Sequence, residues 1–69
     1  MTGALQPHQL RVIAEKDELD DRLLKLLAFV ETQAYQDLPA GERGRLSEQA
    51  AAMMLYSCVL SRRIDAFVL

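Results

Sequence analysis

Arginine side chains are the groups in this sequence best suited to hold a ligand. Arg62 and Arg63 are adjacent near the C-terminal end, and Arg11 lies near the N-terminal end. A guanidinium group donates paired hydrogen bonds to phosphate oxygens, so three arginines brought together could hold a phosphodiester. A structural role stays open for Arg62 and Arg63. They could stabilise the negative end of a helix and pair with Asp65 or Glu15.

The tyrosines are the second candidates for ligand contact. An aromatic ring can stack on a nucleobase, and Tyr35 and Tyr56 supply two such rings. Tyr56 follows Leu55 and lies one helical turn from Met53. A position at the edge of the core, with the hydroxyl in water, is therefore the competing interpretation for Tyr56.

Catalytic and metal-binding signatures are nearly absent from the sequence. It has one histidine and one cysteine, no glycine-rich phosphate loop and no C-x-x-C pair. The acidic residues of the first half are interrupted by Lys16 and Arg22, which indicates a solvated helix face. These acidic residues are Glu15, Asp17, Glu18, Asp20 and Asp21. We therefore expect no enzymatic activity, no metal site and no cofactor.

A C-terminal helix must position Tyr56 and the arginine pair. Apolar residues spaced four and three apart predict a heptad seam, apolar at six of seven positions. The seam consists of Leu46, Ala50, Met53, Ser57, Leu60, Ile64 and Phe67. A second apolar row consists of Ala51, Met54, Leu55, Cys58 and Val59. A helix that is apolar on two sides needs two neighbours.

The rest of the chain supplies one of these neighbours. Helical periodicity predicts a first helix at about 8–33, after an arm at 1–7. A loop at about 34–38 follows, and Pro39 opens a second helix at about 39–67. So short a connection predicts an all-α fold, an antiparallel αα-hairpin, as one domain over residues 1–69.

Antiparallel packing would bring the ligand-binding candidates together. His8 and Arg11 begin the first helix, and Arg62 and Arg63 end the second, so all four should lie at one end of the hairpin. With Tyr56, these residues form the predicted site for phosphates and bases.

Composition points to self-association. A chain of 69 residues is usually marginal without disulfides, metals or partners, and this one is 51% hydrophobic. We therefore expect the hairpins to assemble as a homo-oligomeric helical bundle. Its expected interface consists of Met53, Met54, Leu60, Ile64 and Phe67.

Net charge and cysteine content restrict the ligands and the cellular compartment that we expect for this protein. The net charge of −2 is unlike that of a duplex nucleic-acid binder, but leaves room for a small phosphorylated ligand. No apolar run is long enough to span a membrane. No signal-peptide pattern is present, and one cysteine fits the reducing cytosol. Because Cys58 lies in an apolar helical row, we expect its thiol to be buried.

The assembled pattern resembles a family of small phage proteins. It is similar to the helical-hairpin domain shared by anti-CBASS and anti-Thoeris nucleotide sponges, first noted in crAss-like phages. The resemblance covers about residues 8–67. Its first-helix positions are Arg11, Val12, Glu15, Glu18, Leu19, Arg22, Leu23, Lys25, Leu26 and Phe29. The turn contributes Leu38, Pro39 and Glu42, and the second helix Leu46, Gln49, Met53, Tyr56, Leu60, Arg63, Ile64 and Phe67.

The resemblance implies a non-catalytic sponge. Such proteins form oligomers, often hexamers, and bind cyclic di- or trinucleotide or cyclic ADP-ribose-type signals without cleaving them. By similarity, Arg63 and Tyr56 are the matching polar positions, with Arg11 at the facing helix start. The setting would be the cytosol of an infected bacterial host. The alternative is a small interaction module that docks its apolar face on a host or phage protein.

Overall fold

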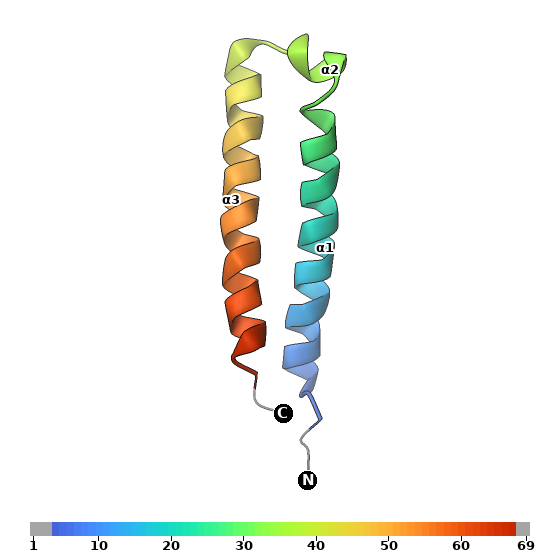
Figure 1. Cartoon of the computed structure of the whole chain (residues 1–69), viewed down its shortest axis with the longest axis vertical. Helices are drawn as coiled ribbons and strands as arrows, with labels where there is room; N and C mark the ends of the chain where they lie inside the picture. The colour runs from blue at the N-terminus through green and yellow to red at the C-terminus, as the bar shows by residue number, and fades with distance from the viewer. Residues whose placement is uncertain (1–3, 68–69) are drawn as a thin grey trace.

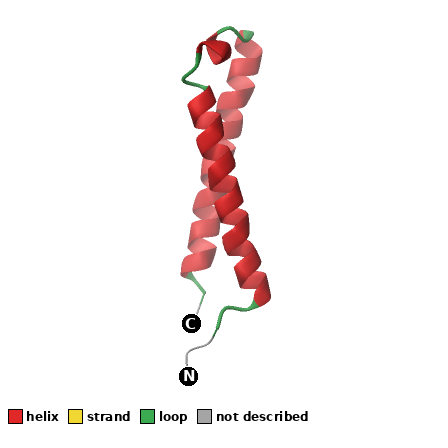
Figure 2. Cartoon of the chain, turned by 90° about the vertical axis from the view of Figure 1, so that its right-hand side faces the viewer, coloured by secondary structure: helices red, strands yellow, loops and turns green. Residues whose placement is uncertain are grey.

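Two long antiparallel helices and one short helix make up the computed structural model of this chain, which describes residues 4–67 (Figure 1). Helix α1 spans Pro7–Phe29, α2 spans Gln33–Gln36 and α3 spans Ala40–Asp65. No strand occurs within residues 4–67, so the predicted all-α hairpin is confirmed. The hairpin is a rod of 56 × 15 × 14 Å. Figure 2 shows that α1 and α3 cross near the middle of the rod.

Helix α1 begins where proline is best tolerated. Pro7 lacks an N–H, and the first helical residues have no intrahelical acceptor for theirs. The side chain of Gln9 reaches back, and its Oε1 accepts a hydrogen bond from the Gln6 N–H at 2.8 Å. This contact pairs one of the free donors at the start of the helix.

Helix α1 ends at Phe29, four residues before the predicted end, because Thr32 starts a new helix. The Thr32 hydroxyl donates to the Phe29 carbonyl at 2.6 Å and accepts from the Tyr35 N–H at 3.3 Å. A threonine in this position satisfies the free N–H groups of the following turn. The predicted loop at 34–38 is therefore mostly the short helix α2.

Hydrogen bonds of Tyr35 connect this turn to α3. Its hydroxyl donates to the Arg43 carbonyl at 3.1 Å and lies 3.1 Å from the Ser47 Oγ. Its ring meets Phe29 edge to face, with centroids 6.1 Å apart. Arg43 adds a bond from its Nε to the Leu38 carbonyl at 3.2 Å. Tyr35 is thus committed to the turn, and the predicted role in base stacking falls to Tyr56 alone.

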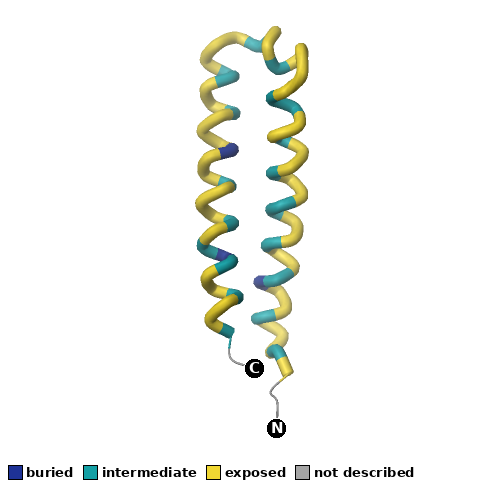
Figure 3. Tube along the Cα trace, in the orientation of Figure 1, coloured by how far each residue is buried: buried dark blue, intermediate teal, exposed yellow. Residues whose placement is uncertain are grey.

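The core runs along the facing sides of α1 and α3 and is thin. Val12, Ala50 and Leu60 are buried, and Leu60 is completely so, at 0% exposure (Figure 3). Ala50 and Leu60 belong to the predicted seam. Leu60 was expected at a surface between copies, but within the single chain α1 covers it completely.

One polar contact joins the long helices at mid-length. Ser57, the polar position of the seam, donates from its Oγ to Asp20 Oδ1 at 2.5 Å. The other oxygen of Asp20 accepts from Lys16 Nζ at 2.5 Å. These bonds lower the pKa of Asp20, the Lys16 bond most and the Ser57 bond next. A polar pair in an apolar seam helps to fix the alignment of two helices.

Candidate functional site

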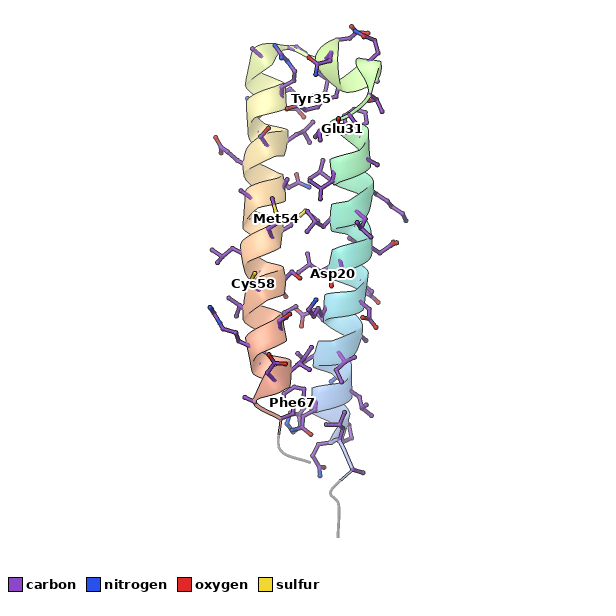
Figure 4. All side chains as sticks on the ribbon, viewed as in Figure 1. Asp20, Glu31, Tyr35, Met54, Cys58 and Phe67 are labelled. Atoms are coloured by element: carbon purple, nitrogen blue, oxygen red, sulfur yellow. The ribbon has the colours of Figure 1, made fainter. Side chains whose placement is uncertain are left out.

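The Ser57–Asp20 contact fixes how each long helix is turned about its axis. Successive helical residues lie about 100° apart. Tyr56 and Cys58, on either side of Ser57 in the sequence, therefore face opposite flanks of the hairpin. Asp20 and Cys58 lie at the same height of the rod in Figure 4. The side of α1 beside Asp20 and the side of α3 beside Cys58 form one flank, and it differs in composition from the flank of Tyr56.

The flank that carries Cys58 is apolar. Leu24 and Leu27 follow Asp20 at four and seven positions, so they lie on its side of α1. Leu24 and Met54 are 67% and 45% exposed. We call the group the apolar patch. It consists of Leu24, Leu27, Ala51, Met54 and Cys58. Leu55 is 65% exposed but lies seven residues before Arg62, on the face of α3 that points away from α1.

The apolar patch differs from the predicted interface. Of the five residues expected there, Met54 is exposed in it, whereas Met53, Ile64 and Phe67 are half-buried. Met53 and Ile64 line the seam inside the hairpin. The expectation that Cys58 is buried is wrong for the single chain, in which its thiol is free and exposed. Its row is apolar, but that row faces away from α1.

The opposite flank, which we call the polar flank, carries Tyr56. Gln49, Tyr56 and Arg63 are spaced seven apart and so form one stripe along α3. Arg22 lies two residues, or about 200°, from Asp20, which places it on the polar flank of α1. Arg11 lies on the same side of α1 as Arg22. Tyr56 is 44% exposed and extends beyond the core edge.

Antiparallel packing puts the four predicted cations at one end of the hairpin, as expected. The first residues of α1 and the last of α3 lie together in Figure 1. His8, Arg11, Arg62 and Arg63 are all exposed. Arg62 and Arg63 do not share a face, however. Arg62 points away from α1, whereas Arg63 lies about 100° further around the axis of α3, on the polar flank.

In the described part of the hairpin these four cations have no acidic partners. Among residues 4–67, no ion pair within 4.0 Å involves His8, Arg11, Arg62 or Arg63. The alternative pairing with Asp65 or Glu15 is not formed. Arg62 and Arg63 do lie in the last turn of α3, where positive charge stabilises the helix end.

Other cations are already engaged. Lys25 pairs with Asp21 at 3.0 Å and Arg45 with Glu42 at 2.9 Å. Lys16 is held by Asp20. The free guanidinium groups are therefore concentrated on the polar flank and at the open end of the hairpin.

The acidic run of α1 is spread around the helix. Two of its carboxylates, Asp20 and Asp21, are bound by lysines. Within the described part of the chain, no three His, Cys, Asp or Glu side chains gather closely enough to hold a metal ion.

The shape of the hairpin limits what one copy can enclose. Residues 4–67 form no cavity or cleft, and the rod is about two helices wide. None of the helices within residues 4–67 could span a membrane. A ligand on the polar flank of one copy would be covered on one side.

Comparison with known proteins identifies the family. No curated protein and no solved structure matches the chain. A family model described as Sequestin matches residues 6–66, which covers α1, the turn and α3. The resemblance drawn from the arginine, tyrosine and seam positions is thus confirmed, and the chain belongs to the Sequestin family.

Proposed function

We propose that this protein is a non-catalytic phage anti-defence sponge. It assembles as a homo-oligomer and sequesters a cyclic oligonucleotide or cyclic ADP-ribose-type immune signal in the cytosol of an infected bacterium. The family name itself suggests sequestration. The observation that carries the proposal is the stripe of Tyr56 and Arg63, which are exposed on one flank, and Arg63 has no acidic partner among residues 4–67.

The stripe offers two kinds of contact at a useful spacing. Seven helical residues span about 10.5 Å, so Tyr56 and Arg63 are two turns apart. The Tyr56 ring can stack on a base, and the Arg63 guanidinium can bind a phosphate of the same ligand. Arg11, at the facing start of α1, adds a second guanidinium near Arg63. Arg62 faces away and contributes little to this site.

A second copy would complete the site. A cyclic di- or trinucleotide carries two or three phosphates, whereas the stripe of one hairpin has one arginine at its end. Rotational symmetry repeats Arg63 and Tyr56 once per copy around an axis. Copies whose polar flanks face each other would surround the ligand and exclude water from its phosphates. The way these flanks meet determines the number of copies. A hexamer is one expectation.

The residues present favour binding without cleavage. The cysteine and the histidine of the chain are far apart, since Cys58 lies level with Leu19 and His8 begins α1. About 11 helical residues, or roughly 16 Å, separate them along the rod. They cannot act as a pair within one hairpin. We therefore expect the bound ligand to be recovered unchanged.

The test is a titration with a panel of cyclic di- and trinucleotides and cyclic ADP-ribose isomers. Thermal shift reports binding, and mass spectrometry after denaturation reports whether the ligand is intact. Binding raises stability by about 2.7 kcal/mol at a hundredfold excess over the dissociation constant. A shift with intact ligand supports a sponge, a shift with a degraded ligand indicates an enzyme, and no shift with any ligand contradicts the proposal.

Arg63→Ala and Arg62→Ala form a matched pair of variants. They remove the same side chain from adjacent positions on different faces. Loss of hydrogen bonds to a charged phosphate should weaken binding about ten- to a hundredfold in Arg63→Ala. Arg62→Ala should bind nearly as wild type. Equal losses in the two variants would show that general positive charge, and not the stripe, holds the ligand.

The apolar patch favours one alternative function. A small helical interaction module would dock this surface on a helix of a host or phage protein. Such a module needs no small ligand, so it predicts no thermal shift with any member of the panel. It also predicts that Arg63→Ala leaves the biological activity unchanged.

A further inference from the structure

The hairpin exposes more surface than a protein of its mass normally does. Its accessible area is 5115 Å² for 7.8 kDa. Folded monomers of this mass expose about 4,400 Å². The excess of roughly 700 Å² is close to the ~800 Å² that each partner buries in a standard interface. A single further contact of ordinary size would therefore restore the usual balance.

The apolar patch is where such a contact belongs. Counting from the Ser57–Asp20 bond, Leu24 and Leu27 of α1 lie level with Met53 and Ala50 of α3, beside the patch residues Met54 and Ala51. The patch is thus one area near mid-length that both helices line. Its rim on α1 carries Asp17 and Glu31, which disfavours an anionic lipid surface as the occupant.

We propose that the apolar patch is covered by the same patch of a second copy, related by a two-fold axis parallel to the rod. In this arrangement α1 of each copy packs on α3 of the other. All four neighbouring helix pairs are then antiparallel, as in a four-helix bundle. Leu24 and Leu27 of one copy meet Met54 and Ala51 of its partner. The inference rests on the homo-oligomer proposed above but requires no ligand.

Charge complementarity selects this axis. Asp17 lies three residues before Asp20 and is therefore level with Leu60, three residues after Ser57. Arg62 is within one helical turn of that level and faces outward. The two-fold axis places Arg62 of one copy beside Asp17 of the other at the rim of the interface. Neither side chain forms an ion pair within its own hairpin, as far as residues 4–67 show.

The pairing of copies also places Arg62 and Arg63 in different environments. Arg62 lies at the rim between paired copies, whereas Arg63 stays on the polar flank, which the pairing leaves open. Cys58 becomes covered by the partner's α1. The thiol that is exposed in the single hairpin should therefore react slowly with thiol reagents in the assembled protein.

Native mass spectrometry and dilution of the ligand-free protein test the contact between copies. Leu24→Ser should weaken pairing at least about tenfold and speed the labelling of Cys58. The matched control is Leu55→Ser, an equally exposed leucine (65%) that faces away from α1 and lies outside the patch, so this variant should pair nearly as wild type. Circular dichroism verifies that both variants remain helical. A monomeric wild type at micromolar concentration, or equal weakening by the two substitutions, overturns the proposal.

A charge exchange tests the axis. Asp17→Arg places two cations together and should weaken pairing about two- to fivefold. Adding Arg62→Asp to the same chain should restore the wild-type dissociation constant. Failure of the double variant to recover overturns the two-fold arrangement. If wild-type protein pairs but binds no cyclic nucleotide, the pairing stands while the proposed function falls.

Discussion

Replacing Leu60 with alanine tests whether the hairpin is held by its thin seam. Leu60 is fully buried, and only Val12 and Ala50 are buried with it among residues 4–67. Leucine-to-alanine changes in cores cost about 2–5 kcal/mol, and more where the cavity cannot collapse. A site between two helices lies close to solvent and relaxes easily. We therefore expect Leu60→Ala to lower the free energy of unfolding by about 2–3 kcal/mol.

That loss is large for this chain. At 0.05–0.15 kcal/mol per residue, 69 residues correspond to a total stability of about 3–10 kcal/mol. Small proteins lose about 1 kcal/mol of stability per molar urea, so the unfolding midpoint should fall by about 2–3 M. Far-ultraviolet circular dichroism in urea measures this shift. Because assembly contributes to stability, all variants are compared at one protein concentration.

Leu10→Ala is the matched control for Leu60→Ala. Leu10 is exposed in the first turns of α1, so its truncation should change stability by no more than about 0.5 kcal/mol. Midpoints that fall equally in the two variants would refute the reasoning. The helix pair would then be held by general hydrophobic collapse and not by the seam at Leu60.

Three further predictions concern the seam, the turn and the start of α3. Lys16 and Ser57 lower the pKa of Asp20, so its charged form stabilises the fold above about pH 4. In acid unfolding, the wild type should be more stable than Asp20→Asn above that pH and should lose this difference as the pH falls below it. Tyr35→Phe removes the hydroxyl bonded to Arg43 and Ser47 and should cost about 1 kcal/mol, with faster hydrogen exchange around the turn. Gly44→Ala should raise the free energy of unfolding by about 0.5–1 kcal/mol, because a Cβ at Gly44 meets nothing within 4 Å and alanine favours a helix. An unchanged unfolding midpoint would count against a regular helix at this position.

The hairpin itself follows from sequence periodicity. Heptad spacing in the second half predicted the side of α3 that contains Ala50 and Leu60, and both are buried. Pro39 located the start of α3 to within one residue. The end of α1 was less predictable. Thr32 and Gln33 are compatible with a continuing helix, and the contacts that stop it run to Tyr35 and on to α3.

The site was predicted less completely than the fold. Ser57 stood out as the polar position of the seam, but the sequence could not choose among Asp17, Asp20 and Asp21 as its partner. That choice depends on the rotation of α1, which only packing determines. The same rotation decides that Leu24 is exposed on the side of Cys58. By contrast, the separation of Arg62 from Arg63 follows from helical geometry alone and could have been predicted.

The difference between the two flanks has a consequence for ligand control. If copies pair through the apolar patch, assembly is driven by buried hydrocarbon and depends little on salt. The polar flank depends on exposed guanidinium groups, whose attraction for phosphates weakens as salt screens it. Raising ionic strength should therefore reduce ligand affinity while leaving paired copies intact. A sponge built in this way can release its ligand without falling apart, because Arg63 and Leu24 act on opposite sides of the same two helices.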